Sequence, residues 1–354
     1  MNALIHWLEE RFDFSQAKSF AEQKRVPSFK GSFWYYFGGV SLFLVIVQVA
    51  TGILLLMYYQ PGAETAFESV HFIISKVQFG WLVRSIHSWA ANLMILSVFI
   101  HMFSVYFTKA FRKPRELTWL SGFLLLCFAL ALGFTGYLLT WNTLSFFATK
   151  VGTEITAVVP WIGKPMVEFL RAGPDVGTAT LTRFFGFHVA IFPAVFTVIL
   201  LIHLFFVQVQ GMSEPESWQQ VPEEKKSFIP FFPNFVLRDL LLWLIVLNLL
   251  AILAVFFPWE LGEKADPFAP APAGIKPEWY FLFMYQSLKY FPAKIFQIDG
   301  EVIGVVLFGL AGLLWFLVPF WDIRTPRGIR NRIINSIGIV VVLFIIVLSV
   351  IGAR

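Results

Sequence analysis

Long apolar stretches recur along the chain, each about as long as a helix that crosses a bilayer. They lie at residues 36–58, 87–107, 118–139, 185–207, 236–257, 302–321 and 333–351. Runs of this length without polar alternation are typical of membrane helices, whereas the strands of a membrane barrel alternate apolar and polar positions. The pattern therefore predicts an all-α polytopic membrane protein with about seven transmembrane helices.

The polar segments between these stretches divide the chain into four expected parts. They are an amphipathic N-terminal surface segment (1–35), a four-helix domain (36–211), a surface linker rich in Glu, Pro and Lys (212–235) and a three-helix C-terminal domain (236–354). Two further loops, at about 140–184 and 258–301, are too long to be simple connections. We expect both to contain short surface helices that cover a site.

Composition and charge agree with a membrane protein and indicate its orientation. Hydrophobic residues make up 58% of the chain and charged residues only 14%. Lys and Arg are in excess in the loops on the N-terminal side, mainly in 109–115 and 324–332, which predicts a cytoplasmic N-terminus and a C-terminus outside. The formal net charge of +5 needs no nucleic-acid partner to explain it.

Four of the six histidines form a matched pattern inside two of the apolar stretches. His87 and His101 are 14 residues apart, and His188 and His203 are 15 apart. On a helix these intervals correspond to roughly 21–22 Å and return to one broad face. Two such helices side by side would make two stacked histidine pairs, one near each membrane surface. This geometry suits two bis-histidine haems that carry electrons across a bilayer.

The competing interpretation is that each histidine is a hydrogen-bonded interior residue. An ionisable side chain inside a span is nevertheless costly and indicates function, and the fourfold pattern favours haem ligation. The single cysteine, Cys127, lies within a span, and the chain contains no Cys-x-x-Cys-His motif for covalent haem attachment. We therefore expect haem held by coordination and packing alone.

Glycines repeat the histidine interval on two other spans. Gly38 and Gly52 are 14 residues apart, as are Gly122 and Gly136. Glycine lets a flat macrocycle approach the backbone closely, although ordinary helix packing through small residues is the alternative. Pro193, between the second pair of histidines, should kink its helix.

Arg84 lies one turn before His87. A guanidinium there could pair with a haem propionate, or it could be an interfacial anchor that reaches the lipid headgroups.

The sequence Pro277-Glu278-Trp279-Tyr280 stands in the second long loop, on the expected outer side. A half-desolvated Glu278 beside a quinol pocket could accept a hydroxyl proton, with Tyr280 next to it. Without further context an interfacial turn with a surface glutamate is the simpler explanation.

Several motifs in order resemble cytochrome b of the quinol–cytochrome c oxidoreductase (cytochrome bc) family. They are Gln48-Val49-Ala50-Thr51-Gly52, Gly80-Trp81-Leu82-Val83-Arg84-Ser85-Ile86-His87, Lys113-Pro114-Arg115-Glu116-Leu117-Thr118-Trp119, Thr180-Leu181-Thr182-Arg183-Phe184, Ala265-Asp266-Pro267-Phe268 and the Pro-Glu-Trp-Tyr sequence. The resemblance covers about residues 25–350. It is greatest to the bf-type proteins of chloroplasts and cyanobacteria, in which the two blocks are separate chains called cytochrome b and subunit IV.

The resemblance implies two non-covalent haem b groups in a bacterial cytoplasmic membrane. His87 and His188 would ligate the outer haem, and His101 and His203 the inner one. Quinol would be oxidised beside Glu278, with one electron passing to a Rieske iron–sulfur protein and the other through the haems to an inner quinone. The resemblance also implies proton translocation, a c-type cytochrome subunit and a homodimer within a multisubunit complex.

The chain departs from the bf-type pattern near the inner haem. Tyr36 stands where relatives carry the cysteine that attaches a third haem, so no covalent haem is expected; a non-covalent one near Tyr36 stays open. Ser104 and Gln208 replace basic residues of that group. The resemblance places the inner quinone site at Asp239 and the adjacent Arg238.

Two other functions compete with the resemblance. A dihaem membrane anchor of a respiratory dehydrogenase would leave the histidine-free C-terminal block and the loop around Glu278 without a role. A transporter that relays protons through its histidines would be expected to show an inverted repeat between the blocks, and we find none. Both are less favoured than a quinol-oxidising cytochrome b.

Overall fold

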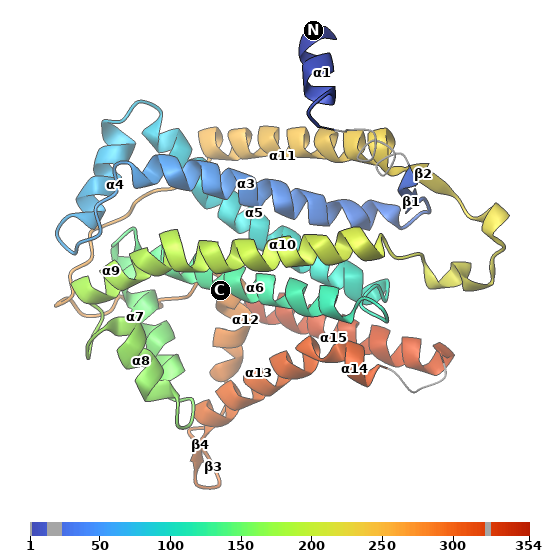
Figure 1. Cartoon of the computed structure of the whole chain (residues 1–354). Coiled ribbons are helices and arrows are strands. Elements are labelled where there is room, and N and C mark those ends of the chain that lie inside the picture. The colour runs from blue at the N-terminus through green and yellow to red at the C-terminus, as the bar shows by residue number, and fades with distance from the viewer. Residues whose placement is uncertain (1, 13–22, 323–326) are drawn as a thin grey trace.

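The computed structural model describes residues 2–12, 23–322 and 327–354. Parts of the expected N-terminal surface segment (13–22) and of the basic loop at 324–332 therefore lie outside the described residues. Most of the described chain is helical, and its long helices run alongside one another (Figure 1). The predicted all-α fold is confirmed.

Six helices of the described chain are long and apolar enough to cross a membrane. Their regular parts are α3 (Tyr36–Leu56), α5 (Gly80–Phe107), α6 (Glu116–Leu138), α10 (Phe192–Gln210), α11 (Val236–Phe256) and α15 (Arg327–Ala353). Many of their large apolar side chains are exposed in the isolated chain, as expected where lipid takes the place of water.

The stretch at 302–321 does not form the single helix that we expected. It is divided into α13 (Gly300–Phe316) and the short α14 (Val318–Trp321). Pro319 has no N–H to donate to the carbonyl of Trp315, which accepts a hydrogen bond from the Trp119 indole instead (3.2 Å). With 17 residues, α13 extends over only about 26 Å and is shorter than the six helices that could cross a membrane.

The first four spans form two packed pairs, α3 with α5 and α6 with α10, and α11 lies against α3 and α5. One apolar core joins them. Its buried members are Leu44, Ala90, Met94, Ile95, Leu125, Ala129, Phe196, Leu250 and Tyr280. The core therefore links all four spans to α11 and to a helix of the second long loop.

The helix that carries the second histidine pair is irregular near its start. Between α9 (Thr178–Gly186) and α10, residues Phe187–Ile191 form one wider turn, η2, which includes His188. Pro193 cannot donate a hydrogen bond to the carbonyl four residues earlier, and such wider turns are a common way to absorb this loss. The distortion lies where Pro193 predicts one.

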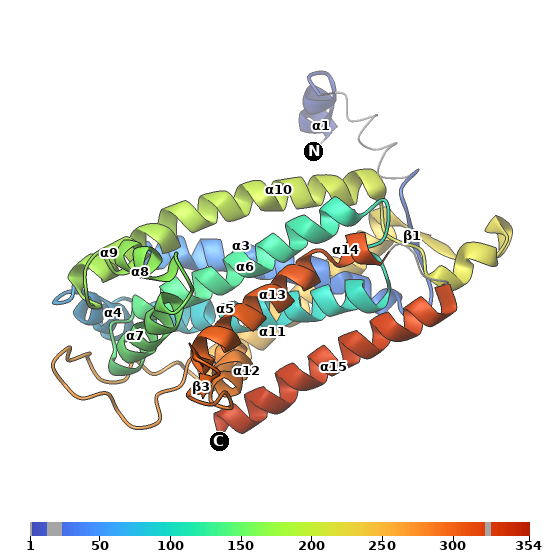
Figure 2. The same ribbon diagram turned by 90° about the horizontal axis from the view of Figure 1, so that it is seen from below.

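Short helices occur in both long loops, as expected. The first loop folds into α7 (Thr143–Ala157) and α8 (Gly163–Arg171) before α9, and Asn142 caps α7 through the backbone N–H of Ser145. The second contains α12 (Trp279–Leu288) and a hairpin of β3 (Lys294–Ile295) and β4 (Ile298–Asp299). However, α12 is not a surface helix, because it packs against α15 and into the core (Figure 2).

The two ends of the bundle carry different elements. Together with α4 (Ala66–Ser75), helices α7 to α9 cover one end, which we call the α7 end. At the opposite end, the β1 end, strand β1 (Arg25–Pro27) pairs antiparallel with β2 (Phe228–Pro230). The short helices η1 (Ser32–Tyr35), η3 (Glu216–Gln220), η4 (Glu223–Lys225) and η5 (Phe231–Phe235) complete it. The polar linker thus folds back onto the N-terminal segment.

Candidate functional site

His87 and His188 face each other near the α7 end of the four-helix unit. The centroids of their rings are 6.4 Å apart, and the ring planes are inclined by 75°. A metal–imidazole bond of about 2 Å on each side, with the half-width of each ring, places such centroids roughly 6 Å apart. The pair therefore fits ligation of one iron by two imidazoles.

His101 and His203 form the corresponding pair toward the β1 end, 14 residues or about 21 Å along α5 from His87. Their imidazoles lie close enough to interact electrostatically. His101 is on α5 with His87, and His203 is on α10, which continues from the turn that carries His188. The structure thus brings together the two pairs that the spacing predicts.

Each of the four glycines lies against one of these histidines. A Cβ built on Gly136 would be 2.5 Å from Cε1 of His188, and one on Gly52 would be 3.4 Å from Cε1 of His87. At the β1 end, a Cβ on Gly38 or Gly122 would be 3.1 Å from Cε1 of its histidine (His101 and His203, respectively). The glycines thus leave room for the edge of each imidazole, and the clearance that we expect them to give a macrocycle stays a prediction.

Hydroxyl and carbonyl groups fix the second ring nitrogen of three histidines. Thr51 Oγ1 is 2.8 Å from Nδ1 of His87, and Ser121 Oγ is 3.0 Å from Nδ1 of His203. Nδ1 of His188 lies 3.1 Å from the Leu132 carbonyl. Such bonds hold the ring so that Nε2 is left for a metal.

Sequence reasoning missed these hydroxyl partners, although the chain contained a signal. Thr51 and Ser121 each stand directly before one of the four glycines, and so does Thr135, whose Oγ1 is 3.4 Å from Nδ1 of His188. Before Gly38 the residue is Phe37, and Nδ1 of His101 is buried without a hydrogen-bond partner among the described residues. A serine or threonine directly before one of the four glycines thus accompanies three of the four histidines.

The Pro-Glu-Trp-Tyr sequence contacts α5 and α6 within about one and a half turns of residues of the first histidine pair. Glu278 is the residue before α12, and its carbonyl accepts from the N–H of Phe281. The indole of Trp279 donates to Asn92 Oδ1 (2.7 Å), one and a half turns along α5 from His87. Tyr280 Oη packs against α6 at Gly133, one turn before Gly136. The Pro-Glu-Trp-Tyr sequence is therefore anchored to both the α5 and the α6 side of the pair.

Burial and nearby charge change the acidity of the groups at this site. Desolvation raises the pKa of the half-buried Glu278 carboxyl. Burial also raises the pKa of Tyr280, and the Glu278 carboxylate and the Tyr137 phenol raise it further. Tyr137, which sequence reasoning missed, thus belongs to the surroundings of Glu278.

Arg84 is buried and makes contacts that the sequence did not predict. Its guanidinium donates to the backbone carbonyls of Trp259 and Glu260, which follow α11. Arg84 therefore ties the second long loop to α5. These bonds use two of its five donors, and a bond to a haem propionate stays a prediction.

Asp239 lies against the backbone of α3 at the β1 end. Its carboxyl contacts Gly39, whose neighbour Gly38 faces His101. One of its oxygens, Oδ1, is buried without a partner among the described residues, whereas the adjacent Arg238 is exposed. Tyr36 stacks on Phe235, with ring centroids 4.7 Å apart. Asp239 is thus placed beside the second histidine pair.

Lys24 of the N-terminal segment brings a positive charge to Gln208, which stands where bf-type relatives carry a basic residue. The Lys24 ammonium donates a hydrogen bond to Oε1 of Gln208 (2.5 Å). Ser104 donates to the carbonyl of His101 (2.7 Å) and so remains part of its own helix.

Comparison with known proteins identifies the family. A model described as cytochrome b/b6/petB matches residues 23–211, and one described as cytochrome b (C-terminal)/b6/petD matches residues 264–354. The chain belongs to the cytochrome b family. It is an electron-transport protein of membranes, of the type found in cytochrome bc and b6f complexes, and haem b binding is a property of the family.

Relatives of this cytochrome b chain include fused and separate forms. A cytochrome bc complex cytochrome b subunit of Chlorobaculum thiosulfatiphilum is 48% identical over 347 residues, which cover 98% of this chain and 80% of that protein. Cytochrome b6 of Gloeobacter violaceus is 41% identical over 215 residues, 61% of this chain and 100% of that protein.

A solved structure titled hyperthermophilic respiratory Complex III has the same fold. It superposes with a TM-score of 0.82 at 28% identity and covers 98% of each chain. The family resemblance drawn from the sequence motifs is confirmed, and so is the fold.

Proposed function

We propose that this cytochrome b chain is the catalytic membrane subunit of a bacterial quinol-oxidising complex of the bc type. The α7 end would be the outer side, and the β1 end, where the strand before the first span lies, would be the cytoplasmic side. Quinol would be oxidised beside Glu278, and quinone would be reduced beside Asp239. Two contacts support this proposal: Trp279, the neighbour of Glu278, bonds Asn92 about one and a half turns from His87, and Asp239 contacts Gly39, the neighbour of the glycine that faces His101.

The chain's residues divide the work of holding two haem b groups. His87 and His188 would hold the outer haem and His101 and His203 the inner one, while Gly38, Gly52, Gly122 and Gly136 leave room at each imidazole edge. When bound, the haems supply one-electron redox chemistry at two depths of the membrane. Thr51 and Ser121 orient the rings of two ligands.

At the outer site the chain would take up protons from the substrate. Oxidation of a quinol to a quinone releases two electrons and two protons. The Glu278 carboxylate can accept a hydroxyl proton there, because its raised pKa brings its basicity closer to the working pH. Tyr280 and Tyr137 line the same surroundings. We infer that a Rieske iron–sulfur protein takes one electron and passes it to a c-type cytochrome.

At the inner site the reverse chemistry requires protons. Reduction of a quinone to a quinol takes up two electrons and two protons. Among the described residues Asp239 has a buried oxygen without a partner, and its carboxyl contacts Gly39, the residue after the glycine that faces His101. We propose that Asp239 delivers a proton to the quinone and that the exposed Arg238 attracts anionic groups to this surface. Uptake inside and release outside would translocate protons.

Haem content and turnover test the proposal together. The complex purified from membranes should contain two haem b per chain by the pyridine haemochrome assay and should reduce cytochrome c with an added quinol. A Rieske protein should co-purify, in a dimeric multisubunit assembly. Purified complex without haem, or with haem but no quinol oxidation, would contradict the function.

Gly136→Val should selectively impair the outer haem site. A side chain there collides with His188, because even a Cβ would be 2.5 Å from Cε1. We expect haem content to fall from about two to about one per chain. Gly309→Val on α13 is the matched control, since no heavy atom lies within 4 Å of its Cβ position. Equal haem content in the two variants would refute the clearance role of Gly136.

Asn92→Leu should slow quinol oxidation without removing haem. The change deletes the acceptor of the Trp279 indole and so loosens the residue next to Glu278. We expect kcat to fall about tenfold, as one lost buried hydrogen bond of roughly 1.4 kcal/mol would give. Asn248→Leu is the control. Like Asn92, Asn248 donates its amide N–H to the backbone carbonyl four residues earlier in its own helix, but among the described residues its side-chain oxygen accepts no bond from another helix. Recovery of turnover in Asn92→Asp would confirm the acceptor role, and an unchanged kcat in Asn92→Leu would exclude it.

A further inference from the structure

The ring nitrogen Nδ1 has a hydroxyl neighbour in three of the four paired histidines, and His101 is the exception. In His87, His188 and His203, Nδ1 lies within 3.4 Å of a hydroxyl from the residue directly before one of the four glycines. Nδ1 of His101 is buried and has no hydrogen-bond partner among the described residues. The four imidazoles therefore divide into three with an acceptor at Nδ1 and one without.

The sequence of α3 explains why this hydroxyl is missing. The residue before Gly38 is Phe37, whereas the corresponding positions carry hydroxyl residues (Thr51, Ser121 and Thr135). The ring of Phe37 packs against the rings of Phe33 and Trp34, with centroids 5.7 Å apart in both cases. A phenylalanine side chain has no acceptor for an N–H group, so position 37 leaves His101 without one.

The backbone does not take the place of the hydroxyl either. At His188 a second acceptor is the carbonyl of Leu132 (3.1 Å), four residues before Gly136 on α6. The residue four before Gly38 is Trp34, which precedes α3 and belongs to the 3-10 helix η1. Such a helix has three residues per turn instead of 3.6, so its carbonyls point in other directions than those of an α-helix. Accordingly, no carbonyl of η1 bonds Nδ1 of His101.

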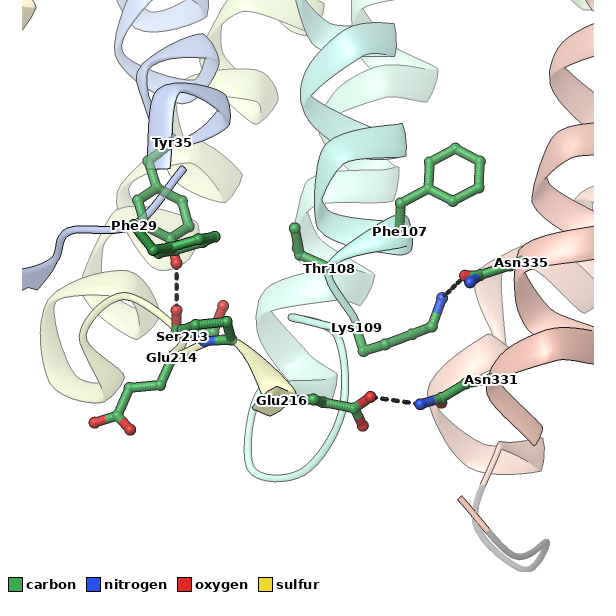
Figure 3. A pocket seen from close by; sticks show the side chains of 11 residues that line it. Phe29, Tyr35, Phe107, Thr108, Lys109, Ser213, Glu214, Glu216, Asn331 and Asn335 are labelled. Atoms are coloured by element: carbon green, nitrogen blue, oxygen red, sulfur yellow. Dashed lines mark hydrogen bonds between the residues drawn. The ribbon is translucent and has the colours of Figure 1, made fainter. Parts of the chain in front are cut away.

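Contacts at the β1 end hold η1 in this position. Tyr35, its last residue, donates its hydroxyl to the Ser213 carbonyl of the linker (2.5 Å), beside a cavity of about 230 Å³ (Figure 3). Phe29 lines the same cavity and packs edge-on against Tyr35, with ring centroids 5.7 Å apart. The turn before α3 is therefore fixed both by the linker and by the segment that precedes it.

Two serines near His101 use their hydroxyls elsewhere. Ser97 stands one turn before His101 on α5, and its Oγ is 2.9 Å from that of Ser41 on α3. Both hydroxyls are also within hydrogen-bonding distance of the Phe37 carbonyl, at 2.8 Å for Ser41 and 3.3 Å for Ser97. They thus bond each other and the α3 backbone, and neither is a partner of Nδ1 of His101.

We propose that Phe37 tunes the reduction potential of the haem held by His101 and His203, by leaving the Nδ1–H group of His101 without an acceptor. This inference rests on the haem ligation proposed above. An imidazole that binds a metal through Nε2 keeps a proton on Nδ1, and a hydrogen bond from that group makes the ring a stronger electron donor. Stronger donation stabilises ferric more than ferrous iron and lowers the reduction potential. Without this bond, the potential is higher than a hydroxyl at position 37 would make it.

Two substitutions of equal size at position 37 isolate the effect of the hydroxyl. Phe37→Thr places an acceptor in the register of Thr51, whereas Phe37→Val has the same shape without one. Redox titration of the purified complex should show one haem b component at a lower potential in Phe37→Thr than in Phe37→Val. We expect the ratio of oxidised to reduced haem to differ about tenfold at one ambient potential, as a hydrogen bond of roughly 1.4 kcal/mol would give. For one electron this is about 59 mV.

The identity of the shifted component decides the outcome. Equal potentials in Phe37→Thr and Phe37→Val would refute the proposal. A shift confined to the component that is lost in His188→Leu would refute it as well, because Phe37 would then not act through His101. A wild-type complex without two haem b components would instead contradict the proposed function, by a count that does not depend on these shifts.

Thr51→Val tests the same relation where the hydrogen bond exists. Thr51 Oγ1 is the partner of Nδ1 of His87 (2.8 Å), so its loss should raise the potential of the haem held by His87 and His188 and leave the other component unchanged. Thr197→Val is the matched control, since Thr197 is exposed on α10 and its hydroxyl bonds the carbonyl of Pro193 in its own helix. This comparison decides the proposal even where the variants at position 37 do not fold, and equal potentials in Thr51→Val and Thr197→Val would refute it.

Discussion

His188→Leu in the complete complex should leave one haem b per chain instead of two and abolish electron transfer across the membrane. His188 is one of the two imidazoles whose rings face each other at 6.4 Å, and leucine offers no donor atom for iron. The remaining haem would be held by His101 and His203, which lie roughly 21–22 Å away along their helices. Redox titration of the purified variant should show a single haem b component, and quinol-dependent reduction of cytochrome c should fall to background.

His71→Leu provides the control for this prediction. His71 is exposed on α4, outside both pairs, so this variant should keep two haems and normal turnover. His188→Leu protein that folds and still binds two haems would disprove the ligand assignment. Protein that does not fold would leave Gly136→Val as the independent test of the same site, since that change keeps the imidazole.

The histidine pairs could be predicted from the sequence because helix geometry leaves little freedom. An interval of 14 or 15 residues on a continuous helix fixes both the axial separation and the shared face. Only the turn at Phe187–Ile191 disturbs this relation, and Pro193 signals it. The glycines were predictable for the same reason, since they repeat the interval on the partner helices.

Contacts between segments far apart in the chain could not be predicted in this way. The bond of Trp279 to Asn92 joins residues 187 positions apart, and that of Arg84 to Trp259 joins residues 175 apart. No helical or strand periodicity relates such residues, because the course of the loops and the side-chain rotamers determine whether they come into contact. Pro319 is a signal in the sequence for the break between α13 and α14. The apolar residues around it nevertheless have the pattern of an unbroken span.

The burial of α12 was missed for a related physical reason. Its sequence, Trp279 to Leu288, is short and aromatic, as an interfacial helix would be. In a membrane protein, apolar residues on such a helix can face lipid, water-exposed loop or core, so hydrophobicity alone does not choose among them. The packing of α12 against α15, and of Tyr280 against α6, decides where this helix lies, and it leaves the preceding Glu278 half-buried rather than exposed.

Glu278→Gln should slow quinol oxidation about hundredfold, within the range that a positioned general base contributes. The amide keeps the size of the side chain but cannot accept the quinol proton. Both haems should remain, because Glu278 contacts neither histidine pair directly. Glu263→Gln, at an exposed residue of the same loop, should oxidise quinol at the wild-type rate.

The pH dependence separates proton acceptance by Glu278 from a merely structural role. Burial raises the pKa of its carboxyl, so the group stays protonated to a higher pH than an exposed glutamate does. Only the ionised form can accept a proton, and wild-type turnover should therefore rise with pH as Glu278 loses its proton. In Glu278→Gln this rise should disappear and the residual rate should stay flat over the same pH interval, measured as quinol-dependent cytochrome c reduction. A variant that is slow but keeps the wild-type pH profile would show that Glu278 shapes the pocket without taking the proton, and Tyr137 or Tyr280 would then be the group to replace next.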